Sequence, residues 1–117
     1  MKKYGISLMA FSLISLLSSS LSFGAGDSGK GKIVYGAFCV SCHGINGGGD
    51  GPDAATMTPK STNFTDPAAT INLTPQDIER AVLTGKPGTA MKAFGGILLK
   101  EDFENLATYL NSLMNKQ

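Results

Sequence analysis

The sequence predicts an all-α fold of three to four short helices joined by long loops. Three observations lead to this prediction. Apolar residues recur at three- and four-residue spacing in separate segments. Glycine- and proline-rich stretches lie between these segments, and the flanks of Cys39 and Cys42 show no parallel-strand pattern. The chain of 117 residues is long enough for one domain at most, so its polypeptide core is small.

The first residues have the order of a secretory signal peptide. Lys2 and Lys3 precede an apolar stretch, residues 6–17, which is followed by serines and other small residues. We expect cleavage after Gly24, so that 1–24 is a signal peptide and 25–117 is an exported, periplasmic domain. An uncleaved membrane anchor is the alternative, because about 20 apolar residues span a bilayer.

The charge of the exported part differs from that of the whole chain. From Ala25 onward the chain has eight basic and nine acidic residues, which gives a net charge near −1. No basic stripe is present, and this excludes a nucleic-acid partner.

Residues 29–38 are predicted to form the first helix. Asp27 or Ser28 can cap its N-terminus, and apolar residues follow at helical spacing. Gly31 lies on this apolar side, where the missing side chain would allow another backbone to approach closely.

The next residues, Cys39, Cys42 and His43, form a C-x-x-C-H motif. Two cysteines one helical turn apart can each form a thioether to one porphyrin edge, and the histidine can then reach the iron. We therefore predict one haem c, attached covalently through Cys39 and Cys42. A redox dithiol, a zinc site and a simple disulfide are the alternatives. A zinc site would need about four ligands, and the chain has only two cysteines and one histidine.

A glycine-rich loop, residues 44–52, follows the motif, and residues 53–73 are predicted to stay irregular. The loop lacks the Gly-Lys-Ser/Thr sequence and the preceding strand of a phosphate-binding loop. Thr74, Pro75 and Asp77 then give a strong helix start, and Gly85 ends that helix.

Residues 86–99 are predicted to form another loop. The last helix has the strongest periodic pattern of the chain, in Phe103, Leu106, Ala107, Leu110, Leu113 and Met114. Tyr109 flanks this pattern, so we expect it to meet the first helix near Gly31 and Tyr35.

The iron needs a second axial ligand on the side opposite His43. Lysines, the N-terminus and water are alternatives, but methionine sulfur is the usual ligand in electron carriers and raises the reduction potential. After the signal segment the chain has Met57, Met91 and Met114. Met114 belongs to the apolar side of the last helix, and Met57 lies only fourteen residues after His43, which leaves a tight path to the opposite face. We therefore predict Met91, in the loop, as the ligand.

These features together resemble small monohaem class I cytochromes c. The matching segments are the first helix with Gly31, Cys39 to Gly44, Gly51-Pro52, Gly85 to Met91, and Leu106 to Leu110. The resemblance implies that the first and last helices cross at Gly31 and Tyr109 around one covalently bound haem. It also implies that the carbonyl of Pro52 accepts the Nδ1 proton of His43. Lys92 departs from the pattern, because many relatives have proline directly after the ligand methionine.

The function predicted from these residues is transfer of single electrons, not catalysis. The chain could act as a free carrier or as the electron-entry subunit of a larger dehydrogenase or oxidase. A haem enzyme or ligand-binding protein is the remaining alternative, but the only histidine is already used. We expect a monomer that meets redox partner proteins, with Lys86 and Lys92 steering an acidic partner, and that contacts a membrane only if its N-terminal segment is uncleaved.

Overall fold

The computed structural model describes residues 26–116, and every regular element in this part of the chain is helical. The elements are α1 (Ser28–Phe38), α2 (Val40–His43), the 3-10 helix η1 (Pro52–Thr56), α3 (Pro67–Thr70), α4 (Pro75–Thr84) and α5 (Lys100–Met114). The all-α prediction is confirmed for these residues. The predicted signal peptide, 1–24, lies outside them. None of the described helices is long and apolar enough to cross a membrane.

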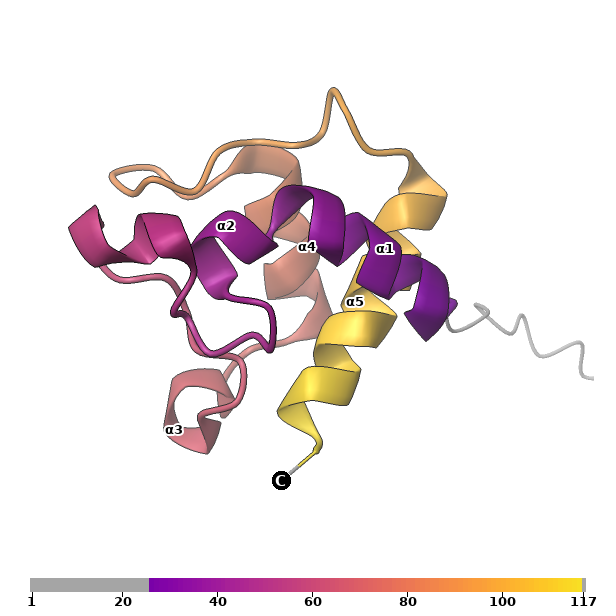
Figure 1. Cartoon of the computed structure of the whole chain (residues 1–117). Helices are drawn as coiled ribbons and strands as arrows, with labels where there is room; N and C mark the ends of the chain where they lie inside the picture. Colours follow the sequence, from indigo (N-terminus) through magenta and orange to yellow (C-terminus); the bar gives the residue numbers. More distant parts are fainter. Residues whose placement is uncertain (1–25, 117) are drawn as a thin grey trace, which may run out of the picture.

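Helices α1 and α5 cross face to face (Figure 1), as the sequence predicts. A Cβ atom on Gly31 would overlap the carbonyl oxygen of Asn105 and would lie 2.8 Å from the Cβ of Tyr109. The rings of Tyr35 and Tyr109 meet beside this point, with their centroids 5.2 Å apart. The missing side chain of Gly31 therefore allows the two helix backbones to touch.

Polar groups fix the start of α1 against α5. The Asp27 side chain caps α1 by accepting the backbone N–H of Lys30 at 2.9 Å. The backbone N–H of Asp27 in turn donates to Oδ1 of the buried Asn105 at 2.7 Å. Lys30 and Glu101 form an ion pair at 3.0 Å, but both side chains are exposed, so this pair stabilises the crossing little.

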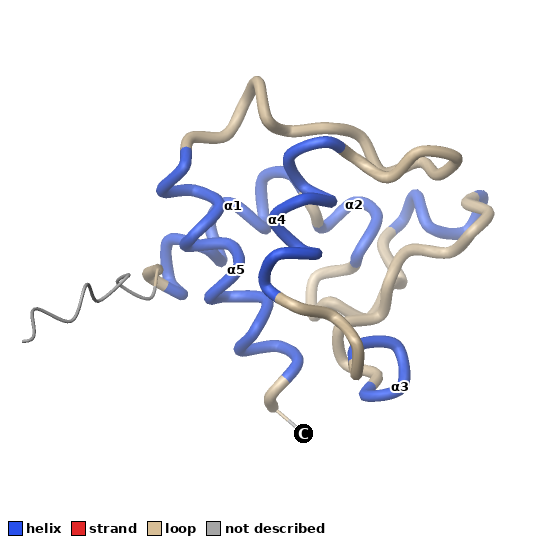
Figure 2. Tube along the Cα trace, turned by 180° about the vertical axis from the view of Figure 1, so that it is seen from behind, coloured by secondary structure: helices blue, strands red, loops and turns tan. Residues whose placement is uncertain are grey.

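Helix α4 begins as the sequence predicts. Thr74 and Asp77 form a reciprocal capping box, Pro75 occupies the first turn, and the helix ends at Gly85 with φ 71°. Ile78 and Val82 turn inward and are buried. Seen from behind, α4 lies across the middle of the molecule, and the long loop that follows it runs over the top to α5 (Figure 2).

The prediction that residues 53–73 are irregular throughout is wrong, because η1 and α3 lie within or at the edge of this segment. Both begin with a proline in the first turn. The carboxylate of Asp66 caps α3 by accepting the N–H of Ala68 at 2.9 Å. One-turn helices are too short to show an apolar period, so only their capping residues could have predicted them.

The core lies between α1, α4 and α5 and includes one residue of the loop that precedes α3. Its buried members are Tyr35, Phe64, Ile78, Val82, Leu98, Phe103, Leu106, Tyr109, Leu110 and Leu113. Cys39 and Val40 from the C-x-x-C-H motif and Met91 from the loop after α4 pack against this core. The fold thus brings the motif and that loop to one hydrophobic centre.

Candidate functional site

The C-x-x-C-H motif lies on one helical turn. Cys39 is the N-cap of α2, and Cys42 and His43 are its last two residues. The backbone N–H of His43 donates to the carbonyl of Cys39 at 2.8 Å, which closes the turn. Because residues three apart lie on the same side of a helix, the two cysteines can face one partner. Both are half-buried free thiols.

The environment of Cys39 is unlike that of a reactive dithiol. Burial, followed by the nearby Cys42, raises the pKa of the Cys39 thiol to about 11. Redox-active C-x-x-C pairs need a lowered pKa, because the thiolate is the nucleophile. The zinc alternative is also disfavoured, because residues 26–116 bring no three Cys, His, Asp or Glu side chains together as a metal-binding group.

The hydrogen-bond partner of His43 corrects one prediction. Its Nδ1 lies 3.1 Å from the carbonyl oxygen of Thr62. The implied bond to the carbonyl of Pro52 is therefore wrong. Pro52 instead begins η1, and the preceding Gly51 packs so tightly against α2 that a Cβ atom there would overlap the carbonyl of Ser41.

The glycine-rich loop explains why the chain at Thr62 can reach His43. The backbone N–H of Phe64 donates to the carbonyl of Gly47 at 2.7 Å, so residues 61–64 run along the loop. Gly49 has φ 74°, and a Cβ atom there would lie 2.7 Å from the carbonyl oxygen of Ser61. The left-handed conformation and the close approach both require glycine at this position.

Burial determines the protonation state of His43. It lowers the pKa of the imidazole, and the nearby charge of Lys86 lowers it further, whereas the bond to Thr62 acts in the opposite direction. The ring is therefore neutral at physiological pH. The neutral form is the one that can coordinate a metal, and the carbonyl on Nδ1 leaves Nε2 as the free donor atom.

Phe64 also contacts His43, and sequence reasoning missed it. The two rings stack with centroids 4.8 Å apart and planes inclined by 26°. The available signal was compositional, since Phe64 is the only large apolar residue between Ser61 and Asp66. A single aromatic in a polar loop is a candidate for an anchor in the core.

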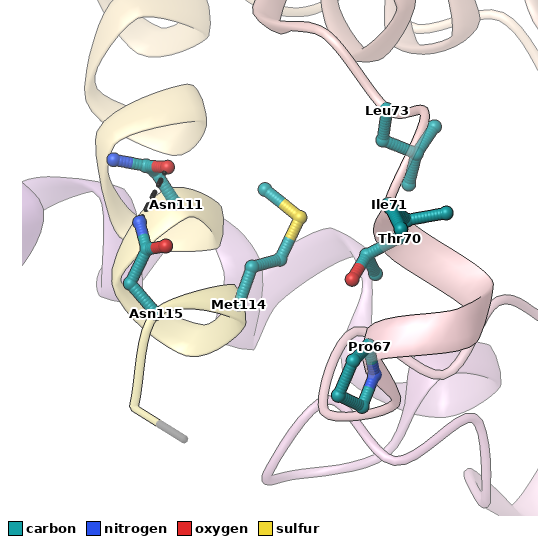
Figure 3. Close-up of a pocket in the computed structure, with 7 residues that line it drawn as sticks. All are labelled: Pro67, Thr70, Ile71, Leu73, Asn111, Met114 and Asn115. Carbon is teal, nitrogen blue, oxygen red and sulfur yellow. Dashed lines mark hydrogen bonds between the residues drawn. The ribbon is translucent and has the colours of Figure 1, made fainter.

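The three methionines after the N-terminal segment lie in different surroundings. Met91, in the loop after α4, and Met114, in α5, are both half-buried and pack against the core. The sulfur of Met57 accepts a hydrogen bond from the hydroxyl of Ser61 at 3.5 Å. Met114 lines a groove of about 270 Å³ between the end of α5 and α3, and its side chain extends into the gap that separates α5 from Thr70 and Leu73 (Figure 3).

Comparison with known proteins identifies the family. Residues 28–114 match the family model described as Cytochrome c. The chain belongs to the cytochrome c family. It is 32% identical over 91 residues to cytochrome c-554(547) of Halothiobacillus neapolitanus, a match that covers 76% of this chain and 99% of that protein. It is also 32% identical to cytochrome c6 of Pyropia yezoensis, over 98% of this chain and 96% of the relative.

Solved structures show the same fold. Cytochrome c6 of the diatom Phaeodactylum tricornutum matches with a TM-score of 0.58 and 29% identity, over 76% of this chain and 95% of the other. A chain of the reducing HAO-like protein complex of Kuenenia stuttgartiensis matches with a TM-score of 0.65 and 30% identity, over 77% of this chain. This cytochrome spans only 44% of that longer chain. The predicted class I cytochrome c fold is confirmed.

The motif residues fit the cofactor of this family. Two free thiols one turn apart suit thioether attachment, and the family membership shows that Cys39 and Cys42 hold one covalently bound haem c. The neutral imidazole of His43 provides a nitrogen donor directly beside these attachments. The predicted cofactor is thus confirmed, whereas the two axial ligands belong to the proposal below.

Proposed function

We propose that this cytochrome is an exported carrier of single electrons, with His43 and Met91 as the axial ligands of its haem. The bound haem supplies an iron that alternates between the ferrous and ferric states. The observation that supports this proposal best is the position of Met91. It packs against the same core as Cys39, although the two residues are 52 positions apart in the sequence.

The loop around Met91 is fastened to α4. The backbone N–H of Lys86 donates to the carbonyl of Met91 at 3.1 Å, and that of Phe94 donates to the carbonyl of Val82 at 2.8 Å. Gly85 lies so close that a Cβ atom there would be 2.7 Å from the Met91 carbonyl oxygen. A methionine ligand whose backbone is held in this way would need little rearrangement when the iron changes its charge, which favours fast electron transfer.

The other two methionines are less suitable. Met57 already uses its sulfur as an acceptor for Ser61, and it does not belong to the residues that pack on the core. Met114 faces α3 from the last turn of α5 (Figure 3). A methionine at such a position most often fills space in the core.

A carrier suits these residues better than an enzyme. Catalysis at a haem needs an open coordination position and an acid–base group beside it. The chain has one histidine, which we assign to the iron, and Met91 would fill the opposite position. We therefore assign transfer of an electron between partner proteins, without a bound substrate.

The same chemistry would serve in an electron-entry subunit of a larger complex. The structural likeness to a chain of the Kuenenia stuttgartiensis complex favours this as the second candidate. Gel filtration of the native protein distinguishes the two, because a free carrier elutes as a monomer.

Export follows from the order of residues 1–24, with Lys2 and Lys3 before the apolar stretch. A periplasmic location also suits haem attachment, which in bacteria takes place outside the cytoplasm. The mass of the mature protein tests this proposal, since cleavage after Gly24 leaves a chain that begins at Ala25.

The ligand assignment is tested by replacing each methionine. Met91→Ala should abolish the sulfur-to-iron charge-transfer band of the oxidised protein, lower the reduction potential and allow small ligands to bind. Met57→Ala is the matched control, because this half-buried methionine lies in another loop and should leave the band intact. Loss of the band in Met57→Ala, with an unchanged band in Met91→Ala, would reverse the assignment.

A further inference from the structure

Phe64 stands out among the core residues because its ring lies directly on the imidazole of His43. The ring centroids are 4.8 Å apart and the planes are nearly parallel, at 26°. The side chain is only 8% exposed. Transfer of electrons through the haem does not by itself require an aromatic ring at this place, so the contact needs its own explanation.

Two properties of an imidazole ligand depend on its surroundings. The ring can rotate about the bond that joins it to Cβ, and its Nδ1–H can bond to a fixed acceptor or to water. In this structure Thr62 provides the fixed acceptor, at 3.1 Å from Nδ1 of His43. The stacked ring of Phe64 covers one face of the imidazole, so that rotation would drive the two rings into each other.

Residues 60–64 provide both contacts to His43, the carbonyl of Thr62 and the ring of Phe64. Phe64 is fixed to the glycine-rich loop by its backbone bond to the carbonyl of Gly47, at 2.7 Å. At the start of the segment, Nζ of Lys60 donates to the carbonyls of Ala54 and Ala55 at 3.1 and 3.0 Å. The acceptor and the ring are therefore held together and cannot shift independently.

We propose that Phe64 is a positioning residue for the iron ligand: its ring fixes the plane of the His43 imidazole and shields the Nδ1–H bond to Thr62 from water. This inference rests on the proposed role of His43 as an axial ligand and deepens it. A hydrogen bond kept free of water makes the ring a stronger electron donor, because groups of this kind set the orientation and basicity of a metal ligand.

The test uses the haem-loaded protein with Phe64→Leu, and with Phe103→Leu as the matched control. Phe103 belongs to the same core and is 9% exposed, and its ring makes no contact with His43 among the described aromatic pairs. Both substitutions remove a buried ring of the same size, so their effects on packing are comparable. A third variant, Phe64→Tyr, keeps a flat aromatic ring at this position.

Two measurements report on the imidazole itself. NMR of the reduced protein gives the rate at which the Nδ1 proton of His43 exchanges with solvent, and EPR of the oxidised protein gives the g values, which depend on the plane of the ligand. We expect Phe64→Leu to exchange at least tenfold faster and to shift the g values. Phe103→Leu should match the parent in both, and Phe64→Tyr should return both toward the parent.

Equal effects of Phe64→Leu and Phe103→Leu would show that Phe64 only fills space, and would overturn the inference while leaving the ligation of His43 intact. A parent protein without a ligated His43 signal would instead contradict the proposed function, and this inference with it. If Phe64→Leu does not fold, Phe64→Met keeps most of the buried volume without a flat ring and is judged by the same two measurements.

Discussion

Helix α1 contains two glycines for which the structure predicts opposite effects of the same substitution. Gly31 faces α5, where a Cβ atom would overlap the carbonyl oxygen of Asn105 and lie 2.8 Å from the Cβ of Tyr109. Gly36 is exposed, and a Cβ atom there would meet nothing within 4 Å. Gly31→Ala and Gly36→Ala therefore separate helix packing from helix propensity.

The magnitudes follow from these contacts. Alanine is favoured over glycine inside a helix by about 1 kcal/mol, so Gly36→Ala should stabilise the protein by about 0.5–1 kcal/mol. At Gly31 the atom in the way is backbone and cannot rotate aside, so the helices must separate, at a cost of about 1–3 kcal/mol. Separation also weakens the contact between Tyr35 and Tyr109, worth about 0.5–1.5 kcal/mol. After subtraction of the helix propensity that alanine gains, we expect Gly31→Ala to destabilise the protein by about 2 kcal/mol.

Guanidinium denaturation of the haem-loaded proteins, followed by circular dichroism, measures both changes. The midpoint should fall for Gly31→Ala and rise for Gly36→Ala, while the slope of the free energy with denaturant stays constant. In thermal unfolding, each kcal/mol corresponds to roughly 4–8 °C for a domain of this size. Gly31→Ala should therefore lower the melting temperature by on the order of 10 °C. If both variants were stabilised alike, the close contact of α1 with α5 at Gly31 would be refuted.

Three further predictions concern attachment, partner encounter and helix capping. Acid–acetone treatment of the denatured protein should leave the haem bound to the chain through Cys39 and Cys42, and extraction of free haem would contradict covalent attachment. Lys86 and Lys92 are exposed and take part in none of the described ion pairs. Replacement of both lysines by Glu should slow electron transfer with an acidic partner and weaken the dependence of the rate on salt concentration. The optical spectrum should stay unchanged. If the rate and its salt dependence equal those of the parent, these lysines have no steering role. Thr74→Ala removes the cap of α4 and should cost about 1 kcal/mol in denaturant titration, whereas an unchanged midpoint would show that the cap contributes nothing.

Several features of the structure could be predicted from residues that are neighbours in the sequence. The start of α4 depends on Thr74, Pro75 and Asp77, which interact within one turn, so no distant residue is needed to predict it. The C-x-x-C-H motif is likewise complete within five residues and identifies the cofactor. The crossing of α1 and α5 was predicted from Gly31 and Tyr109 through the resemblance, and the structure confirms it.

Other features depended on the path of the chain between distant residues. The acceptor for Nδ1 of His43 is Thr62, 19 residues away, and not Pro52, because the glycine-rich loop lets the later segment approach the imidazole. The stacking of Phe64 on His43 arises from the same approach. Short-range capping and motif spacing are properties of neighbouring residues, whereas the carbonyl and the ring that meet a buried side chain are decided only when the loops close around the core.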